Sequence, residues 1–413
     1  MGTDPAATDP ALAVWAALDR LAPPAGALGV ALSGGGDSTA LMQIAAEWAR
    51  SRGRALAVAT VDHALRPESA AEARQAGDAA RALGLDHDIL TWRDHGAGNV
   101  MAQARQARLR LLSQWARGRG LAAVLLGHTQ DDLAETLLMR LSRGAGLDGL
   151  AAMAGARQAQ DMLWLRPMLA VGRAELRDWL RGRGIGWVDD PSNDDPGFDR
   201  ARIRQALAAL GLDTAALAQS ARLLAQARAA LDLMAGEWAR QAQAAQGALH
   251  LPAALMQAAP PETRRRVLLA AVRWVTGAGY APRESQTAHA LSAFALGRRA
   301  TLAGALLDPR GATLLIHREP AAAGRSPTVT GGTWDERWRV PDLPAGQHWG
   351  ALGHAPLPGL DWRGAGFDRD QAAALPAIWQ GRALIAAPLI DGHALRPQPL
   401  RDRHDFTAMF AVH

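Results

Sequence analysis

A glycine-rich turn near the amino end of the chain carries residue types suited to binding a phosphate. The turn comprises Ser33, Gly34, Gly35, Gly36, Asp37 and Ser38. It follows a short apolar run, 27–32, and precedes a helix-like stretch, 39–50. Glycines can take positive φ and keep Cβ atoms away from a ligand, and free N–H groups at a helix start attract anions. The serine hydroxyls would add donors, and the Asp37 carboxylate suits Mg²⁺. No Gly-Lys-Ser/Thr follows, so this is not a Walker A loop.

Alternating strand-like and helix-like stretches position this turn. Apolar runs predict short buried strands at 27–32, 55–61, 86–91 and 121–126. Helical periodicity predicts helices at 38–51, 68–83 and 99–118, between the strands. This alternation predicts an α/β fold whose parallel sheet is covered on both faces. Ligands of such sheets bind at the carboxyl ends of the strands, where the glycine turn lies.

Polar residues follow two further strands at this same edge. Asp62 and His63 end the second strand, and they either line a nucleotide site or shape the loop. His128 follows the fourth strand, and Asp132 and Glu135 are spaced i, i+3 at the opening turn of the next helix. Acids there favour the helix dipole, which is a structural explanation. Because they lie beside a phosphate-binding turn, we instead expect a site for a cation or an ammonium group.

Arginines accompany these groups. Arg105 and Arg108 share one face of a helical stretch that contains no acidic residue, so they either meet phosphates or form a solvated surface. A polar loop at 187–194 is followed by arginines at 200, 202 and 204, which is unusual for a mere linker.

The composition indicates a multidomain globular protein without disulfides. The chain has 413 residues, of which 49% are hydrophobic and 21% charged. All 45 basic residues are arginine, which binds phosphates bidentately, although GC-rich coding also favours arginine. The absence of cysteine excludes thiolate chemistry and cysteine-bound metal clusters. We find no signal peptide and no apolar run of about 18–20 residues, so we expect a cytoplasmic protein that does not span a membrane.

Taken together, these motifs resemble the tRNA(Ile)-lysidine synthetase family of PP-loop ATP pyrophosphatases, over roughly residues 25–210. The resemblance rests on the Ser-Gly-Gly-x-Asp-Ser turn, on 61–66, 127–136, 166–167, 190–193 and 200–204, and on Asn99, Ala104, Arg105 and Arg108. Three positions depart from the family pattern: Met101, Leu109 and Ala201 stand where it often has Glu, Tyr and Asn. We therefore assign those three side chains no role.

The resemblance implies a two-step ligation. AMP is transferred from ATP to the 2-oxygen of the wobble cytidine in the isoleucine tRNA with a CAU anticodon. The ε-amine of free L-lysine then displaces AMP and leaves lysidine, which switches decoding from AUG to AUA. ATP and Mg²⁺ are the implied cofactors. The oligomeric state stays open, and a homodimer is one arrangement that the sequence allows.

The resemblance also implies roles for individual residues. The ATP site would contain Ser33, Gly34, Gly35, Gly36, Asp37, Ser38, Asp62 and His63, with Asp37 holding Mg²⁺. The catalytic group would contain Asp37, Arg108, His128, Asp132 and Glu135, with His128 and Glu135 as candidates for deprotonating lysine. Lysine would be bound by Asp132 and Glu135 through its α-ammonium and by Arg200, Arg202 or Arg204 through its carboxylate. Contacts to tRNA would come from Arg105, Arg140, Arg143, Arg264, Arg265 and Arg266, although a solvated surface explains the last three equally well.

Past residue 212 the character of the chain changes. We expect a catalytic PP-loop domain at 1–212, a linker helix at 213–246, a first tRNA-binding domain at 247–320 and a small β-rich domain at 327–413. A hairpin is predicted at 300–316 with its turn at 308–311, and a linker at 319–326.

Three other functions compete with lysidine formation. Thiolation enzymes of the PP-loop group use cysteines, which this chain lacks. Amidotransferase-type members lack the stretches at 128–136 and 190–204 and normally need a glutaminase. A non-enzymatic RNA-binding protein would leave the phosphate turn and the acid pair without a task.

Overall fold

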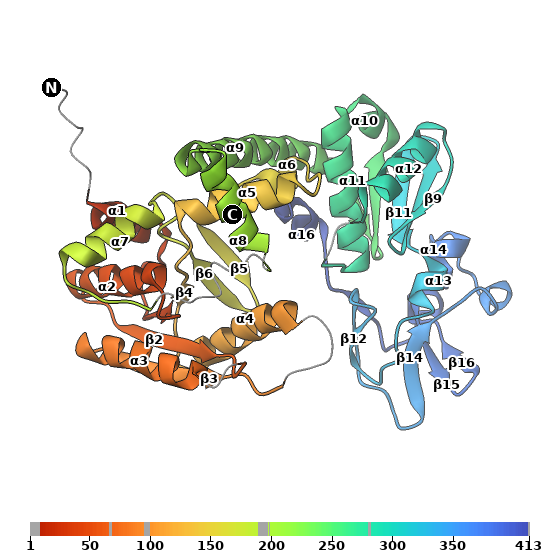
Figure 1. The fold of residues 1–413 in the computed structure, drawn as a ribbon. Coiled ribbons are helices and arrows are strands. Elements are labelled where there is room, and N and C mark those ends of the chain that lie inside the picture. Colours follow the sequence, from red (N-terminus) through yellow and green to blue (C-terminus); the bar gives the residue numbers. More distant parts are fainter. Residues whose placement is uncertain are drawn as a thin grey trace. The chain divides into compact units, whose positions relative to one another are not determined.

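The computed structural model describes residues 9–65, 68–94, 100–188, 197, 199–279 and 282–411. These residues divide between Arg228 and Ala229 into two compact units, which are described separately (Figure 1). The helix α9 (Thr214–Ala239) contains the boundary between them. No helix in the described ranges combines the length and apolar character that crossing a membrane requires.

The first unit is built on a six-stranded sheet of order β3-β2-β1-β4-β6-β5. Its strands are β1 (Leu28–Ala31), β2 (Leu56–Asp62), β3 (Asp86–Thr91), β4 (Ala123–Leu125), β5 (Ala156–Ala159) and β6 (Met162–Leu165). Each adjacent pair is parallel except β5 and β6, which form an antiparallel hairpin at the edge. The predicted parallel sheet is confirmed. This hairpin was not predicted, because its strands are short and β5 is polar.

Helices cover both faces of this sheet, because successive strand residues point to opposite faces. The helices are α1 (Pro10–Leu21), α2 (Gly36–Ser51), α3 (Ser69–Ala82), α4 (Val100–Gly118), α5 (Gln130–Leu141), α6 (Leu147–Leu150), α7 (Arg173–Gly182) and α8 (Asp199–Ala209). Val30 and Val58 belong to one core with α1, α2, α3 and α7. Ala31 and Ala57, their neighbours in sequence, belong to a second core with α4. The rigid three-layer arrangement holds the carboxyl ends of the strands in place.

The second unit contains three antiparallel sheets. The largest has the order β7-β8-β11-β10-β9 and forms one hydrophobic core with the neighbouring helices. The two three-stranded sheets, β12-β13-β17 and β14-β15-β16, share another core, which contains the buried tryptophans Trp334, Trp338 and Trp349. Its strands are β7 (Gln243–Ala245), β8 (Ala248–Pro252), β9 (Ala300–Leu302), β10 (Ala305–Arg310), β11 (Thr313–Arg318), β12 (Gly332–Trp334), β13 (Trp338–Val340), β14 (Gln347–Ala351), β15 (Pro376–Gln380), β16 (Ala383–Ala386) and β17 (Gln398–Pro399). Its helices after α9 are α10 (Ala253–Ala258), α11 (Pro261–Thr276), α12 (Glu284–Ala295), α13 (Pro320–Ala323), α14 (Arg369–Ala373), α15 (Pro388–Asp391) and α16 (Arg403–Ala408), with a 3₁₀ turn at Leu357–Gly359.

Three details of this unit differ from the sequence-based expectations. Asp308 pairs with Leu315 inside the β10–β11 ladder, so the hairpin turns at 311–312 and not at 308–311. The predicted long helix ends at Ala239, and the chain continues into β7 and β8. The predicted linker at 319–326 contains the short helix α13, and its Ala323 is buried in a core.

The helix α16 and Phe410 pack into the core of the largest sheet of the second unit. Phe406 is fully buried there and Phe410 lies beside it. The Trp274 Nε1 donates to the Asp402 carbonyl at 2.9 Å, which ties α11 to the start of α16. The region 327–413 therefore contributes α16 to the core of the largest sheet, while its three buried tryptophans belong to the other core, and the predicted domain boundaries stay a prediction.

Candidate active site

The glycine turn is closed by a network of its own hydroxyls. Gly34 has φ of +83°, a conformation that favours glycine, and Gly35 is the residue before α2. Ser38 Oγ donates to the Gly35 carbonyl at 3.0 Å and lies 3.0 Å from Ser33 Oγ. It also accepts from the Ser33 backbone N–H at 3.1 Å. Because the single Ser38 hydroxyl proton is used on Gly35, we infer that Ser38 shapes the turn. The donation from Ser38 to a phosphate stays a prediction.

Two other segments approach the turn closely. A Cβ placed on Gly127, just after β4, would lie 3.2 Å from both Cα and N of Ser38. The Val188 N–H donates to the Gly34 carbonyl at 3.0 Å, and a Cβ on Gly36 would lie 3.4 Å from the Trp187 indole. The turn is thus held from the sheet side and from the segment after α7, while its glycines leave space for an anion.

Three carboxylates converge beside the turn on one guanidinium. Asp37 comes from the first turn of α2, and Asp132 and Glu135 come from α5; Glu135 is only 1% exposed. The Arg173 Nε donates to Asp37 Oδ2 at 3.0 Å and its Nη1 donates to Glu135 Oε1 at 3.1 Å. Its Nη2 lies 3.8 Å from Asp132 Oδ1. The predicted acid pair and the predicted metal ligand therefore have Arg173 as a common counter-ion.

The two residues of the acid pair, Asp132 and Glu135, have different remaining partners. Asp132 Oδ2 accepts from the Thr129 N–H and hydroxyl at 2.8 and 3.1 Å, while within the described residues Oδ1 has only the two 3.8 Å ion contacts, to Arg173 and to Arg200. Glu135 Oε1 also accepts from Arg204 Nε at 2.6 Å, and Oε2 accepts from Arg204 Nη2 at 3.4 Å. Asp132 Oδ1 therefore has more capacity for a ligand than either oxygen of Glu135.

Burial and charge set the protonation of the carboxyl groups. Burial raises the pKa of Asp37, and Arg173 offsets only part of that rise. Burial also opposes ionisation of Asp132, but its bond from the Thr129 N–H and the nearby His128, Arg173 and Arg200 hold its pKa below the ordinary value. The three carboxylates in turn raise the pKa of Arg173 despite its burial. Arg173 is therefore a permanent cation.

His128 lies among arginines and is neutral at physiological pH. Burial lowers its pKa to about 4; Asp132 opposes this shift, and Arg166, Arg108 and Arg200 add to it. Its Nδ1 is buried without a hydrogen-bond partner in the described part of the chain. The surrounding arginine cluster is defined as Arg105, Arg108, Arg157, Arg166 and Arg200. Burial, together with neighbouring arginines of the cluster, lowers the pKa of Arg105, Arg108 and Arg166, so this region favours an anion.

The donors around Asp37 fit a magnesium ion. Asp37 Oδ1 is buried and lacks a hydrogen-bond partner within the described ranges, whereas Oδ2 is bonded to Arg173. A carboxylate oxygen beside a phosphate-binding turn is the ligand type that Mg²⁺ prefers. Asp37 would hold the ion through Oδ1.

Other predicted residues lie outside this centre or serve other contacts. Asp62 Oδ1 accepts from the Ala64 N–H at 2.8 Å, and the His63 ring meets Trp92 edge-on at 6.0 Å, which supports the loop-forming interpretation. Arg202 pairs with Asp199, so only Arg200 and Arg204 of the three predicted arginines reach the acid pair. The stretch 190–193, Asn99 and Arg66 belong to the residues that the structure does not describe.

Several arginines that were predicted to contact tRNA make hydrogen bonds or ion pairs within the protein. Arg140 donates to the Gly149 carbonyl at 2.6 Å, and Arg143 pairs with Asp199 at 2.6 Å while staying exposed. Arg265 pairs with Glu262 at 2.6 Å, and Arg264 donates to two backbone carbonyls, at 257 and 259. Arg266 is only 7% exposed and pairs with Asp232 at 2.5 Å. The geometry therefore favours a structural role for Arg266 over the predicted RNA contact.

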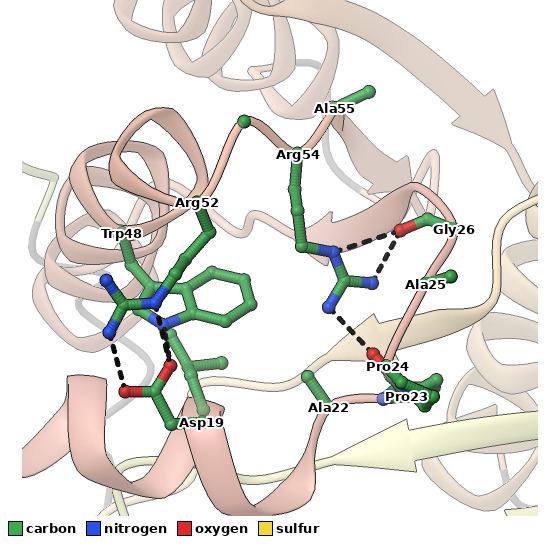
Figure 2. Close-up of a pocket in the computed structure, with 12 residues that line it drawn as sticks. Asp19, Ala22, Pro23, Pro24, Ala25, Gly26, Trp48, Arg52, Arg54 and Ala55 are labelled. Carbon is green, nitrogen blue, oxygen red and sulfur yellow. Dashed lines mark hydrogen bonds and ion pairs between the residues drawn. The ribbon is translucent and has the colours of Figure 1, made fainter.

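A pocket of about 460 Å³ lies at the opposite edge of the sheet, where β1 and β2 begin. Figure 2 shows its two arginines engaged with the protein: Arg54 donates to the carbonyls of Pro23 and Gly26, and Arg52 pairs with Asp19 at 2.9 Å. These contacts join α1 to the end of α2. We assign this pocket a structural role.

Sequence reasoning missed Arg173 and Arg157. An arginine at the start of a helix carries no local signal that distinguishes it from a solvated residue. The position of Arg173 two residues before an acidic capping residue, Glu175, indicates only a helix start. Its role becomes visible when the fold brings α7 against the starts of α2 and α5.

The fold and the phosphate turn define a class of enzyme. A parallel α/β sheet with a Ser-Gly-Gly-x-Asp-Ser turn at its carboxyl edge is typical of PP-loop proteins, and the family model for a PP-loop domain matches residues 14–210.

Similar proteins identify the family within this class. The chain is 43% identical to a tRNA(Ile)-lysidine synthase from Ruegeria pomeroyi, over 88% of both chains. It is 42% identical to the same enzyme from Bradyrhizobium diazoefficiens, over 74% of this chain and 93% of the relative. The chain belongs to the tRNA(Ile)-lysidine synthase family.

Proposed function

We propose that this protein uses ATP to attach lysine to the 2-carbon of the wobble cytidine in the isoleucine tRNA with a CAU anticodon. The observation that carries the proposal is the juxtaposition of a phosphate-binding turn with a buried acid pair and with Arg173, Arg200 and Arg204, linked by hydrogen bonds and ion pairs. A nucleotide site alone would not need the acid pair. The membership of a family of lysidine-forming ligases agrees with this assignment.

In the first step the 2-oxygen of cytidine attacks the α-phosphorus of ATP, and the bond from this phosphorus to the pyrophosphate oxygen breaks. The backbone N–H groups at the start of α2 stabilise the negative charge on the departing pyrophosphate. When bound, Mg²⁺ would supply further neutralisation of phosphate charge. Arg108 and the rest of the arginine cluster stabilise the transferring phosphoryl group, because guanidinium groups donate hydrogen bonds to phosphate oxygens.

In the second step the ε-amine of lysine attacks carbon 2 of the cytosine. The carbon–oxygen bond breaks, AMP leaves with that oxygen, and the amine loses a proton. His128 is a weak base because its pKa is about 4. Glu135 already accepts hydrogen bonds from Arg173 and Arg204, so neither candidate base is well placed to accept this proton.

Free lysine needs anchors at both ends of its backbone. Asp132 Oδ1 has the most capacity for the α-ammonium, and Arg200 or Arg204 would hold the carboxylate. Because tRNA is the second substrate, we expect the enzyme to act in the cytoplasm. The homodimer remains a prediction, and light scattering of the purified protein measures it.

The decisive experiment is mass spectrometry of nucleosides from isoleucine tRNA incubated with the enzyme, ATP and isotopically labelled lysine. We expect a cytidine derivative carrying the lysine label, together with AMP and pyrophosphate, and no such product from a methionine tRNA with the same anticodon. Consumption of ATP with ammonia and a free nucleotide would instead indicate an amidotransferase-type ligase. Binding of tRNA without ATP turnover would indicate an RNA-binding protein.

A further inference from the structure

One cation, Arg173, spans the proposed metal site and the proposed lysine site. Its three guanidinium nitrogens face three different carboxylates: Asp37 at 3.0 Å, Glu135 at 3.1 Å and Asp132 at 3.8 Å. These carboxylates come from α2 and α5, while the arginine opens α7. The side chain is only 17% exposed, so water screens these contacts weakly.

The backbone around Arg173 is fastened directly to the acid pair's helix. Its own N–H donates to Asp131 Oδ2 at 2.7 Å, and the Gln130 N–H donates to the Val171 carbonyl at 2.9 Å. The remainder of α7 is anchored by buried side chains, including Leu176 and Leu180, which share a core with α2. The guanidinium is therefore held by two fixed helices and does not depend on a loop for its position.

The contacts of Arg173 leave a specific set of oxygens for ligands. It binds Asp37 through Oδ2, and the buried Oδ1 is the oxygen without a partner in the described ranges. It binds Glu135 through Oε1, next to Arg204, and only approaches Asp132 Oδ1. A guanidinium that fixes one oxygen of a ligating carboxylate orients the other toward its ligand.

On this basis we infer that Arg173 is a positioning residue that orients Asp37 for the metal and the acid pair for the lysine ammonium. The inference rests on the proposed function, since it names the two ligands by that reaction. Arg173 contacts all three carboxylates at once, so a change in its position at one site changes the orientation of the carboxylates at the other. The binding of lysine and of the metal–nucleotide complex is therefore thermodynamically coupled through this side chain.

The test is equilibrium binding of radiolabelled lysine, with and without Mg²⁺ and a non-hydrolysable ATP analogue, for the wild type and Arg173→Gln. We expect Arg173→Gln to raise the lysine Kd and the Mg²⁺ concentration for half-maximal analogue binding, each by about 10- to 100-fold, as for other groups that orient metal ligands. We also expect the analogue to shift the lysine Kd in the wild type and not in the variant. Arg173→Lys, a point charge that cannot reach three carboxylates, should restore at most one of the two affinities.

Arg181→Gln is the matched control, because it removes the same charge from an exposed position of the same helix. It should leave both affinities within about twofold of the wild type, because Arg181 is exposed and contacts Asp178 at i, i+3 and the Trp187 ring at 5.7 Å rather than the three carboxylates. The inference is overturned if Arg173→Gln changes only one affinity, keeps the coupling, or lowers only the folded fraction measured by circular dichroism. Failure of the proposed function gives a different result, since the wild type itself would then bind no lysine.

Discussion

The two members of the acid pair have different capacities for a ligand, which gives them different roles. In the part of the chain that the structure describes, Asp132 Oδ1 has two ion contacts, both at 3.8 Å, whereas Glu135 is bonded to two arginines. We expect Asp132→Asn to raise the KM for lysine roughly 10- to 100-fold, since a hydrogen bond to a charged group contributes about 1.5–3 kcal/mol. The KM for ATP should change little. Steady-state pyrophosphate release at varied lysine and varied ATP measures both.

Glu135→Gln is the comparison for that experiment. It removes the buried negative charge that pairs with Arg173 and Arg204, so we expect it to lower the free energy of unfolding by about 3–5 kcal/mol and to raise both KM values. An Asp132→Asn variant that raised the two KM values equally would contradict the division of roles.

The environment of His128 argues against its predicted role as the general base. With a pKa of about 4, the imidazole is already neutral at pH 7 and is a poor acceptor for the proton of an alkylammonium. We expect His128→Gln to lower kcat by less than about tenfold and to leave the rate–pH profile unchanged between pH 6 and 8. A loss of about 10²- to 10⁴-fold, the usual contribution of general base catalysis, would restore His128 to that role.

At the scale of elements, the glycine turn depends on how closely β4 approaches the start of α2. A Cβ on Gly127 would lie 3.2 Å from two backbone atoms of Ser38, which cannot rotate away. We expect Gly127→Ala to lower the free energy of unfolding by about 1–3 kcal/mol through overpacking and to weaken ATP binding. Chemical denaturation and nucleotide titration measure these effects.

Gly118→Ala is the control, because a Cβ at Gly118, the last residue of α4, would meet nothing within 4 Å. We expect ATP binding of the wild-type strength from this variant. Equal weakening in both variants would show that the close contact at Gly127 does not matter.

The elements that were predicted correctly carry strong local signals. The parallel strands and the helices between them show apolar runs and helical periodicity, and the glycine turn and the i, i+3 acids have distinctive residue types at fixed spacing. The β5–β6 hairpin lacks such a signal, since Arg157 and Gln158 interrupt any apolar run. Arg173 was missed for a related reason: its importance comes from three carboxylates that are distant in sequence, and no local pattern records such a meeting.

At the scale of the whole molecule, the packing of α16 into the core of the largest sheet of the second unit could not be predicted from local patterns. Phe406 and Phe410 suit any apolar core, and only the tertiary structure shows that they join the one formed by α11, α12 and the largest sheet of the second unit. Deleting 327–413 would therefore remove core residues from the preceding region as well as any tRNA-binding surface. A point substitution is a cleaner probe of this unit than a truncation.

Phe406→Ala provides that probe. Phe406 is fully buried in the second unit, so its truncation should lower the free energy of unfolding of that unit by about 3–5 kcal/mol. The core of the first unit contains no residue of α16, so ATP binding should keep its wild-type affinity. Calorimetry should show the transition of the second unit shifted to lower temperature, and tRNA affinity should fall when that unit is melted.

The control is Leu296→Ala, at a position 67% exposed, whose free energy of unfolding should stay within about 0.5 kcal/mol of the wild type. If Phe406→Ala abolished ATP binding at a temperature where the first unit is folded, the two units would not be energetically independent. The tRNA-binding role proposed for the second unit would then need a test other than its selective destabilisation.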